Sequence, residues 1–178
     1  MADNRVITRF DFDNYFSRDA QAGGKVTLGG RPSLILPLSF FSYLGETASQ
    51  AEKPADQFLY ALGKKLGDDI FNSLTAEIRS ALGIDNIAKV PFQDFLAYLN
   101  GFLAGFGFGS VKLGKEGKAI VVTHEGGVNG SDAPQSLTHF LAGFWAGVFN
   151  SFGGGKMRAA PKNSLPAESV VYLLTKEV

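Results

Sequence analysis

The sequence predicts an α+β protein in which an antiparallel sheet, made of two hairpins and a C-terminal strand, packs against a layer of about four helices. Three observations lead to this fold class. Long stretches repeat apolar residues at three- and four-residue steps, as amphipathic helices do. Two short alternating stretches are divided by glycine-rich turns, which is typical of β-hairpins. The helical stretches lie mostly between the hairpins, so they can cover one face of a sheet.

The composition limits the classes of function. The chain has 178 residues, which suits one domain with a sizeable core, and we expect an N-terminal arm over 1–22 and a single domain over 23–178. Basic and acidic residues number 17 each and are scattered, so no nucleic-acid partner is expected. The absence of cysteine excludes disulfides and thiolate chemistry. We find no signal peptide and no apolar run long enough for a membrane span, and therefore expect a cytoplasmic protein.

The strands are expected in three places. Residues 25–36 form a first hairpin around Gly29-Gly30, and residues 110–124 form a second hairpin around a turn at 114–117. The second arm of the latter carries apolar residues on both faces, which favours a central strand. Residues 168–176 alternate as a final strand, whereas residues 153–166 are expected to be a loop with basic side chains.

Two long helices are expected before the second hairpin, after a short one near 39–44. The first runs over 52–82, with Pro54 at its start and Gly83 at its end. Its expected apolar stripe consists of Phe58, Leu59, Leu62, Leu66, Ile70, Leu74 and Ile78. The Lys64-Lys65 and Asp68-Asp69 pairs on this helix are interpreted as a solvated face. The second long helix opens at Pro91 and ends in a glycine-rich run at 105–109.

The rest of the chain is organised around a helix expected over 132–152, with Asp132 as candidate N-cap. Large apolar residues follow one face at helical spacing: Leu137, Phe140, Leu141, Phe144, Val148, Phe149 and Phe152. The opposite face is small, with Ala142, Gly143, Ala146 and Gly147. Two glycines cost about 1 kcal/mol each in a helix, so a tertiary contact must offset them. Gly63 and Gly67 on the earlier helix share the spacing and are the expected partners.

No catalytic motif is found, and the chemistry-bearing residues are few. His124, Glu125 and His139 could line an enzyme or metal site, but a strand points His124 and Glu125 to opposite faces. We therefore expect no catalytic residue, no metal and no cofactor, and keep a His124/Glu125 enzyme pocket as an alternative. The lone tryptophan, Trp145, is expected in the core, at a subunit interface or in a pocket wall. Core phenylalanines such as Phe144 would line an apolar cavity if the helices do not close completely.

Most of the chain resembles the 4-vinyl-reductase-type domain. The resemblance rests on GGKVTLGGRPSLILPLSFFSYLG, FLYALGKKLG, GFGFGSVKL and above all THFLAGFWAGVF. That superfamily also includes TRAPP-like vesicle-tethering subunits and the effector-sensing domains of some bacterial transcription activators. The resemblance implies an α+β, commonly dimeric module that binds small molecules or partners. Many members carry a cysteine before the His-Phe-Leu-Ala-Gly run, as a metal ligand with a later cysteine pair. This chain has Thr138 there, which argues against a metal centre.

The C-terminal half also resembles the bacterial cellulose synthase D family. The matching stretches are LNGFLAGFGFGSVKL and VVTHEGGVNGSDAP, followed by a helix and a closing apolar strand. This resemblance implies a ring-like oligomer that helps to organise glucan export. The sequence thus predicts a non-catalytic oligomeric module that binds a small apolar ligand or a protein partner, with a cellulose-biosynthesis scaffold that contacts a glucan chain as the alternative. The residues expected at the ligand site or interface are Trp145, Phe144, His139, Gly143, Gly147, His124 and Glu125.

Overall fold

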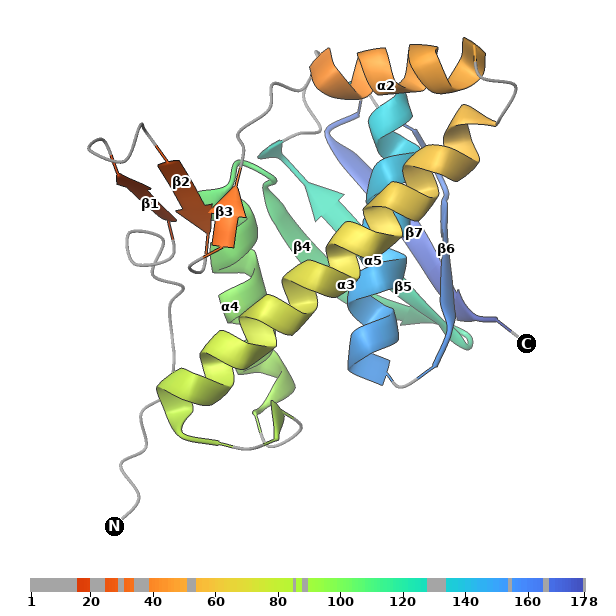
Figure 1. The fold of residues 1–178 in the computed structure, drawn as a ribbon. Coiled ribbons are helices and arrows are strands. Elements are labelled where there is room, and N and C mark those ends of the chain that lie inside the picture. Colours follow the sequence, from red (N-terminus) through yellow and green to blue (C-terminus); the bar gives the residue numbers. More distant parts are fainter. Residues whose placement is uncertain are drawn as a thin grey trace.

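The protein has the α+β fold that the sequence predicted, arranged in three layers (Figure 1). The structure is a computed structural model that describes residues 16–19, 25–28, 31–33, 39–50, 54–84, 86–87, 90–127, 134–153, 155–164 and 167–177. Its elements are β1 (Phe16–Asp19), β2 (Lys25–Leu28), β3 (Arg31–Ser33), α2 (Ser39–Gln50), α3 (Ala55–Leu82), α4 (Phe92–Gly105), β4 (Ser110–Glu116), β5 (Ala119–Glu125), α5 (Ser136–Gly153), β6 (Met157–Pro161) and β7 (Ser169–Lys176).

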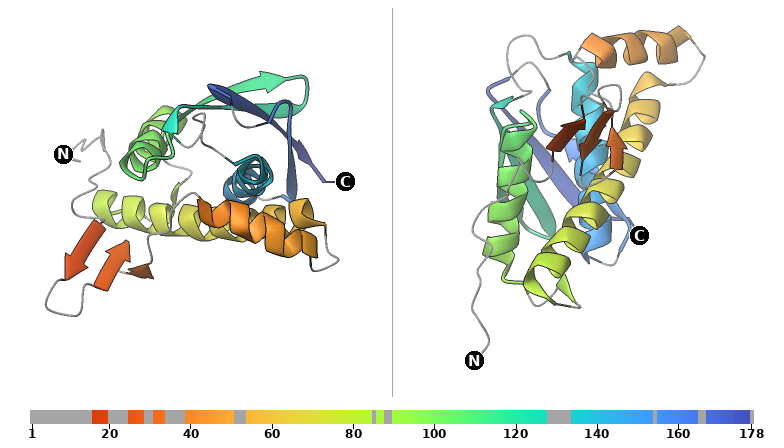
Figure 2. Two further views of the ribbon diagram at one scale, coloured as in Figure 1. Left: turned by 90° about the horizontal axis from the view of Figure 1, so that it is seen from above. Right: turned by 60° about the vertical axis from the view of Figure 1, so that its left-hand side comes forward.

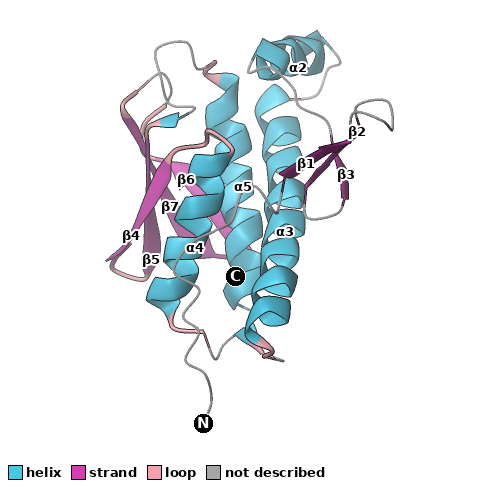
Figure 3. Ribbon diagram, turned by 90° about the vertical axis from the view of Figure 1, so that its left-hand side faces the viewer, coloured by secondary structure: helices cyan, strands magenta, loops and turns pink. Residues whose placement is uncertain are grey.

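The layers are stacked in a fixed order. Seen from above, α4 and α5 form a middle layer, with the larger sheet on one side and α3 crossing on the other (Figure 2). The side view shows the same order, with β1–β3 beyond α3 (Figure 3). Helix α5 is therefore covered on both sides, and its residues from Phe140 to Phe149 are all buried. Burial on both sides explains why this helix is apolar around its whole circumference.

The strands form two sheets rather than the single sheet that we expected. The first hairpin pairs with β1 in a three-stranded sheet of order β1-β2-β3. The second hairpin belongs to a four-stranded antiparallel sheet of order β4-β5-β7-β6. Strand β5 lies inside this sheet, as its two apolar faces indicated. Strand β1 falls within the expected N-terminal arm, and residues 1–15 and 20–22 of that arm lie outside the described residues, as does Asp132.

Helix α3 faces the core with a different stripe from the one expected. Leu59, Phe71, Leu74 and Ile78 are buried, but Phe58, Leu62 and Leu66 are 43%, 40% and 37% exposed. The cause is the pair of glycines: Gly63 and Gly67 must face α5, and this requirement fixes the rotation of the helix. Helix α3 ends as predicted, with Gly83 as its C-cap in the left-handed region at φ 63°.

Four glycines bring α3 and α5 into backbone contact. A Cβ atom on Gly63 or Gly67 would lie within 3.0 Å of the carbonyl oxygen of Phe140 or Phe144 on α5. The contact is reciprocal. A Cβ atom on Gly143 or Gly147 would lie as close to the carbonyl oxygens of Tyr60 or Lys64 on α3. The predicted glycine partnership is confirmed, and its packing offsets the poor helix propensity of glycine.

A strand, β6, replaces part of the loop that we expected at 153–166. Its side chains alternate between buried and exposed, with Met157 and Ala159 facing the core. Pro161 lacks an N–H group, and this loss costs little because β6 lies at the edge of the sheet. Strand β6 has only five residues, including a proline and an arginine, and its alternation was too short to predict a strand from the sequence. Among the helices of the described residues, none is long and apolar enough to cross a membrane.

Candidate functional site

The middle of α5 meets the sheet in a cluster of aromatic and polar side chains. Trp145 is fully buried, and its ring stands edge-on to the ring of His124 on β5, with centroids 5.6 Å apart. Phe144 packs edge-on against Trp145 at 5.1 Å and stacks on Phe108 at 6.2 Å. The sequence placed Trp145, Phe144 and His124 at the site, and the structure brings these three together.

His124 is held in one orientation by the backbone. Its Nε2 atom lies 2.5 Å from the carbonyl oxygen of Phe108, and a carbonyl only accepts, so Nε2 carries the hydrogen. Burial lowers the pKa of this histidine, and the hydrogen bond to Phe108 raises it less, so the net shift is downward. The imidazole is therefore neutral near neutral pH. Within the cluster it acts as a neutral hydrogen-bonding group.

Tyr172 joins this cluster from β7, although the sequence reading did not single it out. On the inner face of the sheet it is a diagonal neighbour of His124, because His124 pairs with Val170 and Val122 pairs with Tyr172. The Tyr172 side chain is fully buried, and burial raises the pKa of its hydroxyl, which stays protonated. The alternation of β7 was recognised from the sequence. Tyr172 is the one tyrosine among the inward aliphatic residues of β7, and this exception in the pattern could have identified it from the sequence.

The indole Nε1 of Trp145 and the hydroxyl of Tyr172 are buried hydrogen-bond groups of this cluster that have no partner among the described residues. Buried polar groups are paired in the great majority of cases, and an unpaired group costs about 1–3 kcal/mol. Both groups are fully buried, one on the central helix and one on the sheet.

The other histidine and the glutamate are not part of this cluster. Glu125 points away from the core and forms an ion pair with Lys112 at 2.8 Å. His139 contacts Asp56 of α3 at 3.5 Å, on the other side of α5. The structure therefore does not assemble His124, Glu125 and His139 into one pocket. The described residues contain no group of three or more potential metal ligands.

A pocket opens where β4 turns into β5, between the sheet and the last turns of α5. Its volume is about 440 Å³. Its apolar lining comes from four elements and consists of Leu113, Ile120, Phe149, Phe152 and Met157. The exposed residues Lys115 and Lys176 also line it. None of the residues predicted for the site lines this pocket. The sequence could not show it because Met157 lies in a segment that was expected to be a loop.

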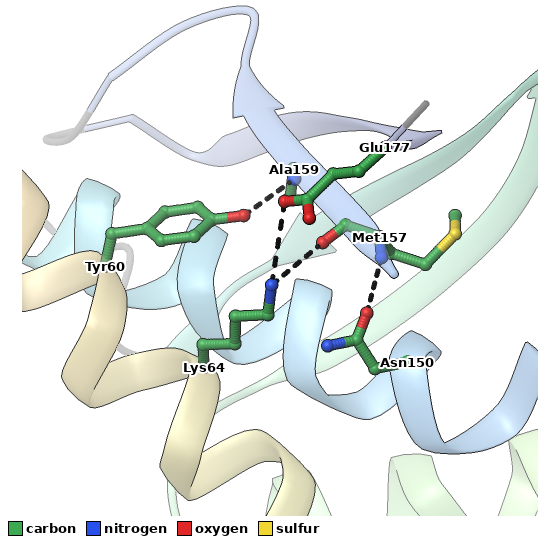
Figure 4. Close-up of polar contacts among 6 residues, drawn as sticks. All are labelled: Tyr60, Lys64, Asn150, Met157, Ala159 and Glu177. Carbon is green, nitrogen blue, oxygen red and sulfur yellow. Dashed lines mark hydrogen bonds and ion pairs between the residues drawn. The ribbon is translucent and has the colours of Figure 1, made fainter. Parts of the chain in front are cut away.

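Side chains from the helices hold the pocket's β6 wall in place (Figure 4). The backbone N–H of Met157 donates to Asn150 Oδ1 at 2.5 Å, and the N–H of Ala159 donates to the hydroxyl of Tyr60 at 3.0 Å. Lys64 reaches the carbonyl oxygen of Met157 at 3.4 Å and Glu177 at 3.7 Å. Together with Pro161, which has no N–H, these bonds occupy the outward donors of the edge strand. The outer edge of β6 therefore offers no free N–H group to a further strand.

The same contacts correct the expectation of a solvated face on α3. Lys65 and Asp69 form an exposed i,i+4 pair at 2.8 Å, as expected. Lys64, however, turns to β6 and Glu177, and Asp68 accepts a hydrogen bond from Ser151 of α5. The close approach of α3 to α5 brings these two residues within reach of elements far away in the sequence.

Compared by sequence, the chain matches no known family model and no curated protein. Compared by structure, it is similar to the phenol-responsive sensory domain of the transcription activator PoxR, solved with phenol. The TM-score is 0.64 at 12% identity, over 93% of this chain and 86% of that chain. A vinyl-4-reductase family protein from Methanocaldococcus jannaschii gives a TM-score of 0.50 at 12% identity, over 82% and 85% of the two chains.

A third similar structure is a trafficking protein particle complex subunit 3 from Naegleria fowleri, covalently bound to palmitic acid. Its TM-score is 0.54 at 11% identity, over 79% of this chain and 93% of that chain. At such identities the likeness shows the fold alone. The chain shares its fold with these three proteins, which agrees with the fold that the 4-vinyl-reductase and TRAPP-like resemblance implied. None of these three structures is a cellulose synthase component, and that resemblance stays a prediction.

Proposed function

We propose that this chain is a ligand-binding module that holds a small, largely apolar molecule between α5 and the four-stranded sheet. The observation that carries the proposal is the apolar pocket at the β4–β5 end of the sheet. Its volume of about 440 Å³ falls within the range of small-molecule sites, roughly 300–1,000 Å³. Its walls come from both layers, so a molecule bound there would contact the sheet and the central helix together.

The aromatic cluster supports the same proposal from the inside. Trp145 lies one helical turn before Phe149, which lines the pocket, and Tyr172 lies two residues before Leu174 on the inward face of β7. Trp145 and Tyr172 do not line the pocket themselves, but their neighbours place the cluster next to its inner wall, because Leu174 pairs with the pocket residue Ile120. The PoxR sensory domain, which shares the fold, was solved with phenol, a small and largely apolar molecule.

We also propose that the module acts as a homo-oligomer, at least a dimer. Phe58, Leu62 and Leu66 recur at four-residue steps on the outer face of α3, and all three are more than a third exposed. Apolar residues arranged in this way on a surface are typical of a protein interface. A scaffold role in cellulose biosynthesis and an enzyme with a His124/Glu125 pocket remain alternatives, and no described feature favours either over ligand binding.

The lone tryptophan supplies a direct test. Phenol, p-cresol and 1-naphthol are titrated into the full chain, while Trp145 emission and the melting temperature are followed. Saturation at 100 times Kd should stabilise the fold by about 2.7 kcal/mol. The test variant is Ile120→Phe, which fills the pocket. The control is Val121→Phe, which introduces the same side chain on the opposite face of β5.

The proposal expects Ile120→Phe to weaken binding at least about tenfold, a loss of roughly 1.4 kcal/mol, and Val121→Phe to leave it nearly unchanged. Equal binding by both variants would place the ligand outside the pocket. If no compound of an apolar panel changes either signal at millimolar concentration, a small-ligand function is wrong.

A further inference from the structure

The charges at the pocket end of the sheet are separated by face. Lys115 on β4 and Lys176 on β7 both line the pocket. Each is followed by a glutamate, and successive side chains of a strand or its extension point to opposite sides. Glu116 pairs with Lys162 at 2.5 Å, and Glu177 pairs with Lys64 of α3 at 3.7 Å. Both glutamates therefore form ion pairs with other lysines, whereas Lys115 and Lys176 line the pocket.

These two lysines differ from the paired lysines of the described chain. Ion pairs are formed by Lys64 with Glu177, Lys65 with Asp69, Lys112 with Glu125 and Lys162 with Glu116. Neither Lys115 nor Lys176 forms an ion pair with any described carboxylate. They come from different strands and meet at one pocket, and no acidic residue is among its described lining residues. An anionic group placed there would have two cations in reach and no repelling carboxylate in the wall.

We propose that the pocket binds a molecule with an apolar body and a terminal carboxylate, with Lys115 and Lys176 as the residues that recognise the carboxylate. The inference rests on the proposed function, because it names the ligand class of the same pocket. The apolar body contacts Phe149, Phe152 and Met157. The ammonium groups, at the exposed end of the pocket, bind the carboxylate by charge-assisted hydrogen bonds.

The experiment compares two probes that differ only in the terminal group. Decanoate and decanol are titrated below their solubility limits into the full chain at pH 7.5, with calorimetry and Trp145 emission as readouts. Decanoate is expected to bind at least about tenfold more tightly, the size of one hydrogen bond to a charged group. Raising the salt from about 0.05 M to about 0.5 M should narrow this ratio, because the lysines are partly solvated.

The variants keep the lysine stems and remove the charges. Lys115→Met with Lys176→Met should reduce decanoate affinity to within about threefold of decanol, and decanol affinity should not fall. Lys112→Met is the matched control, because Lys112 belongs to the same strand, β4, and pairs with Glu125. It should leave the ratio unchanged.

The outcomes separate the two proposals. Equal binding of decanoate and decanol to the unaltered chain would overturn the carboxylate inference and leave an apolar pocket. An unchanged ratio in the double methionine variant would also overturn it. If neither probe binds and the phenolic compounds also fail, the proposed function itself is wrong.

Discussion

Gly143 on α5 lies directly against the backbone carbonyl group of Tyr60 on α3. The contact is within one chain, and three further glycines repeat it along the crossing. Because no side chain separates the two helices, Tyr60 and Lys64 reach past α5 to the backbone of β6. The glycines therefore set the distance between the outer helix and the edge of the sheet. The wall of the pocket depends on that distance.

Replacing Gly143 by leucine should destabilise the fold. The new side chain would meet the backbone of α3 closer than any contact allows, and overpacking costs about 1–3 kcal/mol or more. For a chain of this size the melting temperature should fall by roughly 2–4 °C per kcal/mol. Ala61→Leu on the exposed side of α3 is the control and should change it little. A Gly143→Leu protein that melts at or above the wild-type temperature would contradict the contact.

The loss of the hydroxyl group should destabilise the fold at Tyr60 but not at Tyr172. The Tyr60 hydroxyl accepts a hydrogen bond from Ala159, so Tyr60→Phe should cost about 1 kcal/mol or more. The Tyr172 hydroxyl has no hydrogen-bond partner among the described residues, so Tyr172→Phe should be neutral or stabilising without ligand. Urea unfolding of both variants measures the difference. A larger loss for Tyr172→Phe than for Tyr60→Phe would mean that its hydroxyl is already bonded.

Much of the fold could be read from periodicity because the signals were local. The central helix, the second hairpin, the final strand and the end of α3 at Gly83 follow from spacing and turn chemistry. The rotation of α3 did not follow, because the apolar residues Leu62 and Leu66 match the template as well as Leu59 does. Only the contact with α5 selects the face that carries Gly63 and Gly67. A pattern within one helix cannot contain that information.

The site was predicted in part for the same reason. Trp145, Phe144 and His124 were found because tryptophan and histidine are rare in this chain and lie in strongly periodic segments. Tyr172 and the pocket residues were missed, since their importance depends on strand pairing between β5 and β7 and on the unexpected strand β6. Glu125 and His139 were named for their chemistry alone, and the structure turns both away from the cluster.

Folding stability should depend on the protonation of His124. Burial holds the pKa of the His124 imidazole in the folded protein below its value of about 6.5 in the unfolded chain. Above pH 6.5 both states are neutral and this group carries no penalty. As the pH falls below 6.5 the unfolded state binds the proton first, so stability decreases, by at most about 1.4 kcal/mol per pH unit, until the folded pKa is reached.

Urea unfolding between about pH 5 and pH 8 measures this dependence. His124→Asn should lose this part of the slope, whereas His139→Gln, which removes the other histidine, serves as the control. A slope that is the same in His124→Asn and the wild type would assign the acid sensitivity to other groups.

The exposed stripe on α3 locates the proposed subunit interface. Leu62 and Leu66 follow Phe58 at helical spacing on the side of α3 that does not face α5. A stable dimer buries roughly 1,600 Å² in total, and an introduced carboxylate in its core would have to be desolvated without a partner. Leu62→Glu with Leu66→Glu should therefore convert a dimer into monomers while the circular dichroism spectrum stays the same.

Gln57→Glu adds a charge at an exposed polar position of the same helix and should leave the dimer intact. Sedimentation velocity at micromolar concentration distinguishes the species, and a wild-type chain that sediments only as a monomer would refute the oligomer itself. A dimer that persists in the double variant would place the interface on another face, and the α3 stripe would then be free for a different protein partner.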